Sequence, residues 1–343
     1  MGRLVIPPIN RQQVTIDRSG TPRAIASRVL GLSIFLSGMA AVTIAAPTAN
    51  NGAATPVSHP INSGLNNRDI TISPDGKTLY TSVTSPKNDH AVILESHLKN
   101  GRWSEPELAP FSGTYPDIEP MYSPDGEQLF FASKRPKTDL NGTDWDIWFM
   151  TSTANGWSAP INAGASVNSD GDEFYPSVAA NGNLYFTATR ADGEGSEDIY
   201  VARRNLKTID VIKFEDASPV PGKLNTKTYE FNAFIAPDES YLIFGSQGRE
   251  DEIGGGDLYI SYRQSNGDFG DGVLLPETVN SNKLDYCPYV WQQTFFFTSE
   301  RRSKLDHIDS AKSMKYKFNS PGNGLGDIYG IELEQVLPPP GIK

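Results

Sequence analysis

The sequence contains few of the residues that form disulfides and metal sites. It contains a single cysteine, Cys287, which excludes a disulfide within the chain. Its histidines number only four and show no spacing typical of metal ligands: His59, His90, His97 and His307. Calcium is compatible with the many carboxylates, but no calcium-loop motif supports it. We therefore expect no cofactor and no metal site.

Positive charge is also scarce. The chain has 30 lysines and arginines against 41 aspartates and glutamates, which gives a net charge of −11. Nucleic-acid binding depends on a basic surface that displaces phosphate counterions, so this charge predicts no nucleic-acid partner. The sequence has no glycine-rich phosphate loop that opens a helix and no serine nucleophile elbow. No segment shows a convincing amphipathic-helix pattern either.

The long apolar run of the chain lies near the N-terminus, at 29–46, after Arg18, Arg23 and Arg28. This pattern predicts an export signal over 1–45 that is cleaved after Ala45. The alternative is an uncleaved membrane anchor, because the run approaches the length that spans a bilayer. The polar residues 46–56 predict a flexible leader. We expect a periplasmic or secreted protein that touches a membrane only if the signal segment is retained.

The rest of the chain repeats one phrase. Its fullest copy combines Ser-Pro-Asp-Gly at 123–126, an apolar stretch at 129–131, Arg135, and Asp-Ile-Trp at 146–148. The last turn positions of the five copies are 76, 126, 182, 239 and 294, a period of 50–57 residues. A repeat of this length signals stacked supersecondary units. Its period-two alternation of aromatic and β-branched residues predicts four-stranded antiparallel blades.

The two ends of this region predict how the blades close. Copy five lacks the outer strand that links the other copies, whereas residues 57–63, before copy one, look like the missing strand. Closure by this strand removes the exposed edges of an open sheet. We therefore expect an all-β fold with one monomeric β-propeller over 57–337 and a C-terminal tail at 338–343. Five blades are predicted, with six as the alternative.

The phrase Ser-Pro-Asp-Gly, Arg, Asp-Ile-Tyr resembles the WD-like propeller repeat of the TolB-like superfamily. It is most similar to the versions in periplasmic proteins, where Gly-Trp-Ser-x-Pro phrases such as 156–160 and Asn-Ser phrases such as 168–169 link the blades. The resemblance covers about 57–335 and implies the fold. It leaves function open, because this repeat serves protein-binding scaffolds, peptidase lids and polysaccharide lyases alike.

An arginine and an aspartate recur at the two ends of one loop in four blades. The arginine ends the second strand and the aspartate opens the third, so we expect a bidentate pair that fixes the loop. Because the pattern recurs, we interpret these residues as structural pairs: Arg135 with Asp146, Arg190 with Asp198, Arg249 with Asp257, and Arg301 with Asp327.

The inner strands carry the residues that vary. One set lies nine residues before the last turn position of each copy: Asn67, Asp117, Glu173, Glu230 and Asp285. A second set lies two residues later and differs in every blade: Asp69, Glu119, Tyr175, Asn232 and Cys287. Because alternate residues of a strand share a face, both sets are expected to line the funnel at the propeller axis. The alternative is that the carboxylates pair with nearby arginines.

Two hypotheses for function follow from this funnel. In the first, a non-catalytic propeller binds a protein segment or an envelope glycan through Asp69, Asp117, Glu119, Glu173, Tyr175, Glu230, Asn232 and Asp285. In the second, the chain is a carbohydrate-active hydrolase or lyase with Asp69 and Glu119 as candidate catalytic residues. The five-bladed arabinanase and invertase glycosidases place their carboxylates similarly, and two carboxylates suffice for glycoside hydrolysis. The sequence motifs of those enzymes are absent, which favours the first hypothesis.

A long insertion at 302–326 in blade five is rich in lysine and serine. Loops of this length in a compact fold are often functional, and the alternative is a solvated excursion.

Overall fold

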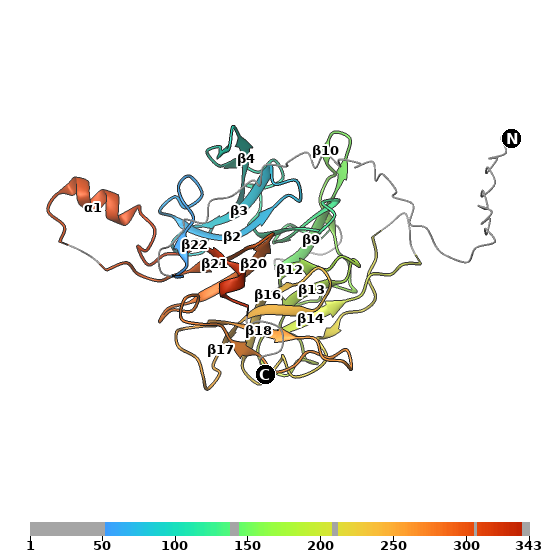
Figure 1. Cartoon of the computed structure of the whole chain (residues 1–343). Helices are drawn as coiled ribbons and strands as arrows, with labels where there is room; N and C mark the ends of the chain where they lie inside the picture. Colours follow the sequence, from blue (N-terminus) through green and yellow to red (C-terminus); the bar gives the residue numbers. More distant parts are fainter. Residues whose placement is uncertain (1–51, 138–143, 208–211, 305–306, 338–343) are drawn as a thin grey trace, which may run out of the picture. The chain divides into compact units, whose positions relative to one another are not determined.

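The computed structural model describes residues 52–137, 144–207, 212–304 and 307–337, which form five antiparallel blades (Figure 1). Blades one to four follow the chain, each from its inner to its outer strand. Blade one contains β2 (Asn66–Ile72), β3 (Thr78–Thr84), β4 (Ala91–Lys99), β5 (Arg102–Trp103) and β6 (Glu107–Leu108). Blade two contains β7 (Asp117–Tyr122), β8 (Gln128–Ser133), β9 (Asp146–Thr153), β10 (Gly156–Trp157) and β11 (Ile161–Asn162).

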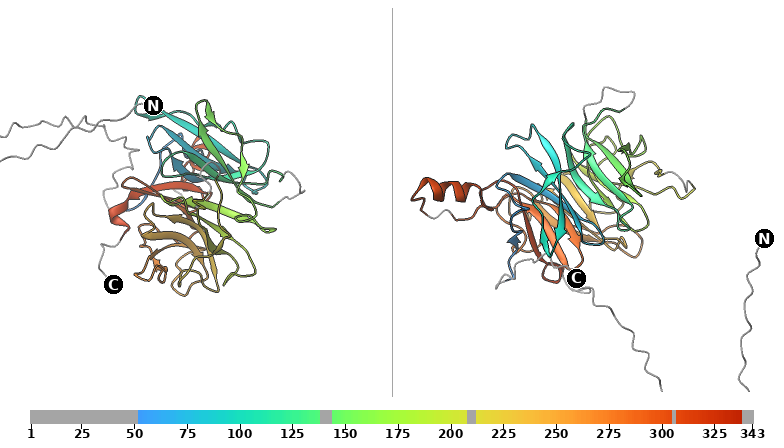
Figure 2. Two further views of the ribbon diagram at one scale, coloured as in Figure 1. Left: turned by 90° about the vertical axis from the view of Figure 1, so that its right-hand side faces the viewer. Right: turned by 90° about the horizontal axis from the view of Figure 1, so that it is seen from above.

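The next two blades repeat this plan with one short outer strand each. Blade three contains β12 (Glu173–Val178), β13 (Leu184–Ala188), β14 (Asp198–Ala202) and β15 (Ser218–Pro219). Blade four contains β16 (Tyr229–Ile235), β17 (Tyr241–Gln247), β18 (Asp257–Tyr262) and β19 (Val273–Leu274). Inner strand β2 contacts β7 on one side and β20 on the other, so the five inner strands close into a ring (Figure 2).

Blade five is completed by the N-terminal strand, as predicted. It contains β20 (Asp285–Trp291), β21 (Thr294–Ser299), β22 (Asp327–Glu332) and, from the other end of the described chain, β1 (Thr55–Pro56). Thr55 pairs with Gly330, and Val57 N donates to Ile328 O at 2.8 Å. The closing strand therefore lies within the segment predicted to be a flexible leader and not over the predicted 57–63, of which only Val57 continues its pairing with β22.

Apolar layers between neighbouring blades form the core. Phe130 and Phe149 of blade two pack with Phe186 and Tyr200 of blade three, and similar layers follow around the ring. Each fully buried side chain of this size contributes about 2–3 kcal/mol of hydrophobic stabilisation. The two faces of a strand pack against the two neighbouring blades, as Phe130 does toward blade three and Phe131 toward blade one, so the period-two pattern leads directly to a core between blades.

The Asn-Ser and Asn-Thr phrases between copies hold each blade to the next. Asn168 Oδ1 accepts from Ile147 N at 2.8 Å, and Asn168 Nδ2 donates to Ile147 O at 3.0 Å. Asn225, Asn280 and Asn62 bind the third strands of blades three, four and five in the same way. An amide side chain offers both a donor and an acceptor, which explains why asparagine recurs at this position.

Within the residues that the structure describes, two helices interrupt the β structure, although the sequence predicted none. The α-helix α1 (Ala311–Phe318) lies in the insertion of blade five, and the 3-10 helix η1 (Leu333–Gln335) follows β22. In the described part of the chain, no helix has the length and apolarity to cross a membrane. The predicted signal at 1–45, most of the predicted leader and the predicted tail at 338–343 lie outside the described residues.

Candidate functional site

The predicted arginine–aspartate pairs are wrong, because each arginine binds an inner-strand acid instead. Arg135 Nη2 lies 2.7 Å from Asp117 Oδ1. The same contact joins Arg190 to Glu173 at 2.8 Å, Arg249 to Glu230 at 2.9 Å, and Arg301 to Asp285 at 2.9 Å. These four acids have no exposed surface, so each buried carboxylate needs the charge that its arginine supplies.

The third-strand aspartates have other partners. Asp146 pairs with Lys137 at 2.9 Å. The other three accept backbone N–H groups of the loop before them: Asp198 from Gly195, Asp257 from Ile253 and Gly254, and Asp327 from Gly322. Burial raises the pKa of Asp327 to about 6. Asp198, Asp257 and Asp327 thus fix their loops through backbone N–H groups.

Within the first set of inner-strand residues, each acid also accepts from a serine or threonine a few positions earlier. Ser169 Oγ donates to Glu173 Oε1 at 2.5 Å, and Ser281 Oγ donates to Asp285 Oδ2 at 2.7 Å. Each of these acids is buried, pairs with an arginine and accepts a hydrogen bond from a hydroxyl, which indicates a structural role. The acids of the first set therefore do not line an open funnel, and the alternative, that these carboxylates pair with nearby arginines, is confirmed.

The second set does converge at the axis. Asp69, Glu119, Tyr175, Asn232 and Cys287 all adopt the left-handed conformation, with φ between 48° and 61°. The strand register shifts around each of these residues, which marks a bulge. Glu119 N donates to Ser82 Oγ at 2.9 Å, and Asn232 N donates to Thr187 Oγ1 at 2.9 Å, each on the preceding blade. The bulges thus join neighbouring blades around the axis.

Arg68 fills the centre of this ring. Its Nε lies 3.1 Å from Asp69 Oδ2, and its Nη2 lies 2.6 Å from Glu119 Oε1. Glu119 Oε2 accepts from Tyr175 N at 2.6 Å, and the Tyr175 hydroxyl donates to Pro288 O at 2.9 Å. Asp69 and Glu119 are only 2% and 3% exposed. The two candidate catalytic carboxylates are therefore buried and share one guanidinium group.

The electrostatics of Glu119 reflect this position. Burial raises the pKa of Glu119 to about 7, and the positive charge of Arg68 opposes the rise. A raised carboxyl pKa is typical of general acids, but it is equally produced by a structural ion pair. Because the oxygens of Glu119 are held by Arg68 and by Tyr175 N, the structure gives this residue no free oxygen aimed at a substrate.

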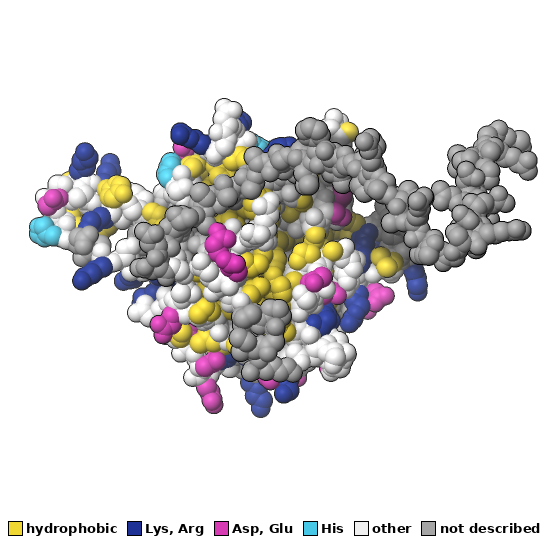
Figure 3. Space-filling view, in the orientation of Figure 1, with side chains coloured by type: hydrophobic (Ala, Val, Ile, Leu, Met, Phe, Trp, Pro, Cys, Tyr) yellow, Lys and Arg dark blue, Asp and Glu magenta, His cyan; other side chains and the backbone are white. Residues whose placement is uncertain are grey.

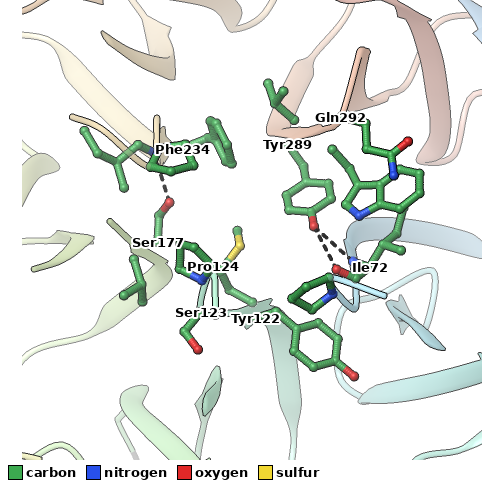
Figure 4. Close-up of a pocket in the computed structure, with 15 residues that line it drawn as sticks. Ile72, Tyr122, Ser123, Pro124, Ser177, Phe234, Tyr289 and Gln292 are labelled. Atoms are coloured by element: carbon green, nitrogen blue, oxygen red, sulfur yellow. Dashed lines mark hydrogen bonds between the residues drawn. The ribbon is translucent and has the colours of Figure 1, made fainter. Parts of the chain in front are cut away.

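A cavity lies on the axis at the other end of the inner strands, which we call the turn face because the Pro-Asp-Gly turns are there (Figure 4). Its volume is about 190 Å³, and all five inner strands contribute to its wall. Apolar side chains dominate the lining, among them Ile72, Met121, Val178, Phe234 and Trp291. We call this cavity the axial pocket.

The inner-strand residue at the level of the axial pocket differs in every blade, and in four of the five blades it lines the pocket. Five residues before the last turn position of each copy lie Thr71, Met121, Ser177, Phe234 and Tyr289. Three of them have hydroxyls that accept a backbone N–H of the next blade: Thr71 from Tyr122, Ser177 from Ile235, and Tyr289 from Ile72, at 3.0–3.1 Å. Met121 and Phe234 have no hydroxyl and line the pocket with apolar surface instead.

The repeated turns form the mouth of this pocket. Pro74, Pro124 and Pro237, from three of the turns, are exposed and line it. Neighbouring turns pack closely, since a Cβ on Gly126, whose φ is +75°, would lie 3.1 Å from the ring of Pro74. In blade five Trp291 and Gln292 replace the Ser-Pro or Ala-Pro of these turns, so this side of the mouth breaks the repeat.

The sequence carries a signal for this pocket at positions outside the two inner-strand sets. Two residues beyond the second inner-strand set, every copy again carries a different residue, and two of these residues, Met121 and Phe234, are apolar. In the described ranges, no three or more histidine, cysteine, aspartate or glutamate residues gather so as to hold a metal ion.

No protein-family model matches the chain, and no curated protein matches it in sequence. Among solved structures, a glycoside hydrolase is similar with 10% identity and a TM-score of 0.51, covering 82% of this chain and 90% of that one. TolB from Acinetobacter baumannii has 12% identity and a TM-score of 0.40, with 78% of this chain covered. The GH43 endo-arabinanase from Bacillus licheniformis has 13% identity, a TM-score of 0.47, and 79% and 94% coverage.

These similarities concern the fold. The chain spans 55% of the length of the TolB chain, and every identity is far below the level at which activity is shared. The five-bladed propeller is shown by the structure itself, whereas the particular repeat family stays a prediction.

Proposed function

We propose that this chain is a non-catalytic propeller that binds a segment of a partner protein at its turn face, with an apolar side chain of that segment in the axial pocket. The single observation that carries the proposal is the pocket itself, where five blades converge on an apolar cavity whose lining differs in every blade. Concave apolar sites with a few polar groups are the usual form of binding sites.

The size and chemistry of the axial pocket favour a protein segment over a glycan. A cavity of about 190 Å³ equals the volume of roughly six water molecules in the liquid, enough for one bulky side chain. A glycan needs polar groups that converge on its hydroxyls. Here the hydroxyls of Ser177 and Tyr289 are already bonded to the backbone of neighbouring blades.

The alternative function, a carbohydrate-active hydrolase or lyase, has weaker support. Glycoside hydrolysis needs one carboxyl group that protonates the leaving group and a second that acts as nucleophile or base. Asp69 and Glu119 share Arg68 and are almost completely buried, so neither has the access that this chemistry requires. Export to the periplasm or the medium remains a proposal from the sequence alone.

Two parallel screens test the class of ligand. The purified protein is used to select from a phage-displayed library of random peptides, and the same protein is applied to a glycan array. We expect selected peptides that share an apolar residue, and no enriched glycan. Binding of a peptide should change the fluorescence of Trp291, which lines the pocket, and the Trp291→Phe variant should lose that change while it still binds.

Two results would overturn the proposal. One is enrichment of glycans without enrichment of peptides. Release of product from a glycan by the wild type, and its loss in the Glu119→Gln variant, would be the more decisive evidence of this kind. The other is a peptide that binds with an unchanged Trp291 signal and equal affinity for all pocket variants, which would place its site elsewhere.

A further inference from the structure

The insertion of blade five has a fixed base and an exposed tip. At the base, Ser303 N donates to Gly322 O at 2.9 Å, and Asn323 Nδ2 donates to Gly64 O at 3.3 Å. Gly322 N in turn donates to Asp327 Oδ2 at 2.8 Å. Beyond this base, α1 stands away from the blades and has no buried residue (Figures 1 and 2).

The helix α1 is stabilised locally but buries nothing. Ser310 and Ser313 form a reciprocal capping box, and Lys315 and Lys317 lie in the last turn, where positive charge is favoured. An eight-residue helix is marginal in water unless it packs an apolar face. Yet three large apolar side chains of α1 are exposed: Met314 by 40%, Tyr316 by 74% and Phe318 by 55%.

The charge of the insertion is opposite to that of the rest of the chain. Residues 302–326 contain five lysines and arginines against two aspartates, a net charge of +3, so the remaining residues carry −14. In Figure 3 the basic side chains gather on this protrusion beside apolar ones. The insertion is therefore the part of the molecule that an anionic surface attracts, and the body is repelled by it.

A basic pocket lies at the junction of the insertion's base and α1. It has a volume of about 410 Å³ and is lined by Arg302, Lys304 and Lys317, together with the hydroxyls of Ser303 and Ser320. Phe318 forms part of the same wall. Cations and hydroxyls beside an aromatic ring are suited to a phosphate group that is attached to an apolar body.

We propose that this insertion docks on the surface of an anionic lipid bilayer, with α1 in the headgroup region and a lipid phosphate in the basic pocket. Lysines and arginines close to an anionic bilayer attract it, while exposed Met, Tyr and Phe side chains insert at the boundary of the acyl chains. Charges of the acidic body that lie more than about 8 Å from the bilayer are screened at physiological salt.

The distribution of side chains around α1 favours a bilayer over a protein groove. Met314 and Phe318 are four residues apart and share one face of the helix, whereas Tyr316 lies on another face beside Lys312. A helix that docks in a groove presents one apolar stripe at i, i+3, i+4 and i+7. Apolar and basic side chains on several faces suit a headgroup layer that surrounds the helix.

Binding to lipid vesicles tests this inference. The protein used begins at Gly52, so that the predicted signal segment is absent. The protein is sedimented with vesicles of phosphatidylcholine alone and of phosphatidylcholine with phosphatidylglycerol. We expect binding to the anionic vesicles only, and loss of it at high salt. In a Tyr316→Trp variant, the emission of the indole introduced on α1 should shift to the blue on binding, as expected for a side chain that enters the headgroup region.

Removal of charge from α1 separates docking from general attraction. The double variant Lys312→Gln/Lys315→Gln should bind anionic vesicles roughly 25-fold more weakly, because each of the two lysines near the surface contributes about a fivefold factor. The matched control is Lys99→Gln/Lys223→Gln, two exposed lysines outside the insertion, which should bind like the parent.

Three outcomes overturn the inference: no binding to anionic vesicles, equal binding by the α1 variant and its control, or tighter binding of soluble poly-glutamate than of the vesicles. The last would indicate an acidic protein as partner. None of these results bears on the axial pocket, so this inference and the proposed function fail independently.

Discussion

At the centre of this propeller, buried ion pairs determine how much stability the replacement of a single residue costs. Arg68 is 18% exposed and holds the carboxylates of Asp69 and Glu119, which are almost completely buried. Each of the four outer arginines holds one fully buried acid in its own blade. Removal of one member of a buried ion pair leaves an uncompensated charge, which costs far more than the pair contributes.

Replacement of Arg68 tests whether the central carboxylates are structural. We expect Arg68→Met to lower the free energy of unfolding by about 3–5 kcal/mol, because two buried carboxylates lose their counter-ion. The triple variant Arg68→Met/Asp69→Asn/Glu119→Gln should recover most of this loss, since it leaves no buried charge. Chemical denaturation measures both effects, and Arg102→Met, at an exposed edge strand, should change stability by less than about 0.5 kcal/mol. A triple variant less stable than Arg68→Met would contradict this account.

The pKa of Asp327 predicts a pH dependence with a definite sign. Burial raises this pKa to about 6 from 3.8, so the folded state binds the proton more tightly than the unfolded state. The stability from this proton is fully present below about pH 4 and is lost as the pH rises through about 6. In Asp327→Asn that loss is absent, so the variant should gain about 2 kcal/mol relative to the wild type between these pH values.

Denaturation at a series of pH values, with Asp170→Asn at an exposed position as the control, measures the effect of Asp327. A difference between Asp327→Asn and the wild type that stays constant from pH 4 to 7 would refute the assigned shift.

Among the elements of the fold, the N-terminal strand β1 is decisive, because its two residues complete a blade whose other strands lie at the opposite end of the chain. The segment after β1 adds the buried side chains of Val57 and Ile61, and Asn62 binds both backbone groups of Ile328. Closure therefore depends on packing and on one asparagine more than on the length of β1.

Truncation tests this closure. A chain that begins at Ser63 should lose on the order of 5 kcal/mol relative to one that begins at Gly52, because it loses two buried apolar side chains and the hydrogen bonds of Asn62. Thermal unfolding should show a melting temperature lower by roughly 10 °C. Equal melting temperatures of the two chains would mean that blade five is stable without its N-terminal part.

The helix α1 shows where element prediction from sequence reaches its limit. Met314, Tyr316 and Phe318 alternate with lysines, which is the period-two pattern of a strand, so the sequence predicted no helix. The capping box of Ser310 and the absence of a neighbouring strand decide the outcome. The prediction of which acid each arginine binds was wrong for a related reason. The end of a second strand lies beside both the inner strand and the third strand. The sequence does not show which of the two neighbouring acids is buried more deeply.

For the whole molecule, the repeat predicted the architecture because every copy encodes one blade, and five copies with a displaced outer strand leave one way to close the ring. The same repeat made the axial pocket difficult to recognise in the sequence. Asp69 and Glu119 stand out in the sequence by their charge, whereas the apolar Met121 and Phe234, which line the pocket beyond the bulges, look like ordinary core residues. Only the assembled ring shows that they enclose a cavity.

The two proposed surfaces belong to different parts of the molecule. The axial pocket lies where the inner strands end, and the insertion leaves blade five between the end of β21 and the start of β22, at the level where the inner strands begin. A bilayer at the insertion would therefore leave the turn face accessible to a protein segment.

The affinity of one selected peptide for pocket variants tests the central claim most directly. Met121→Thr places in blade two the residue type that Thr71 provides in blade one, so it removes apolar surface from the pocket with little change of fold. Isothermal titration should show at least about tenfold weaker binding to Met121→Thr than to the wild type, because truncation of a contact at the centre of a site commonly costs more than 1 kcal/mol. The matched variant Met314→Thr on α1 should bind like the wild type. Equal affinity for all three proteins would contradict the account.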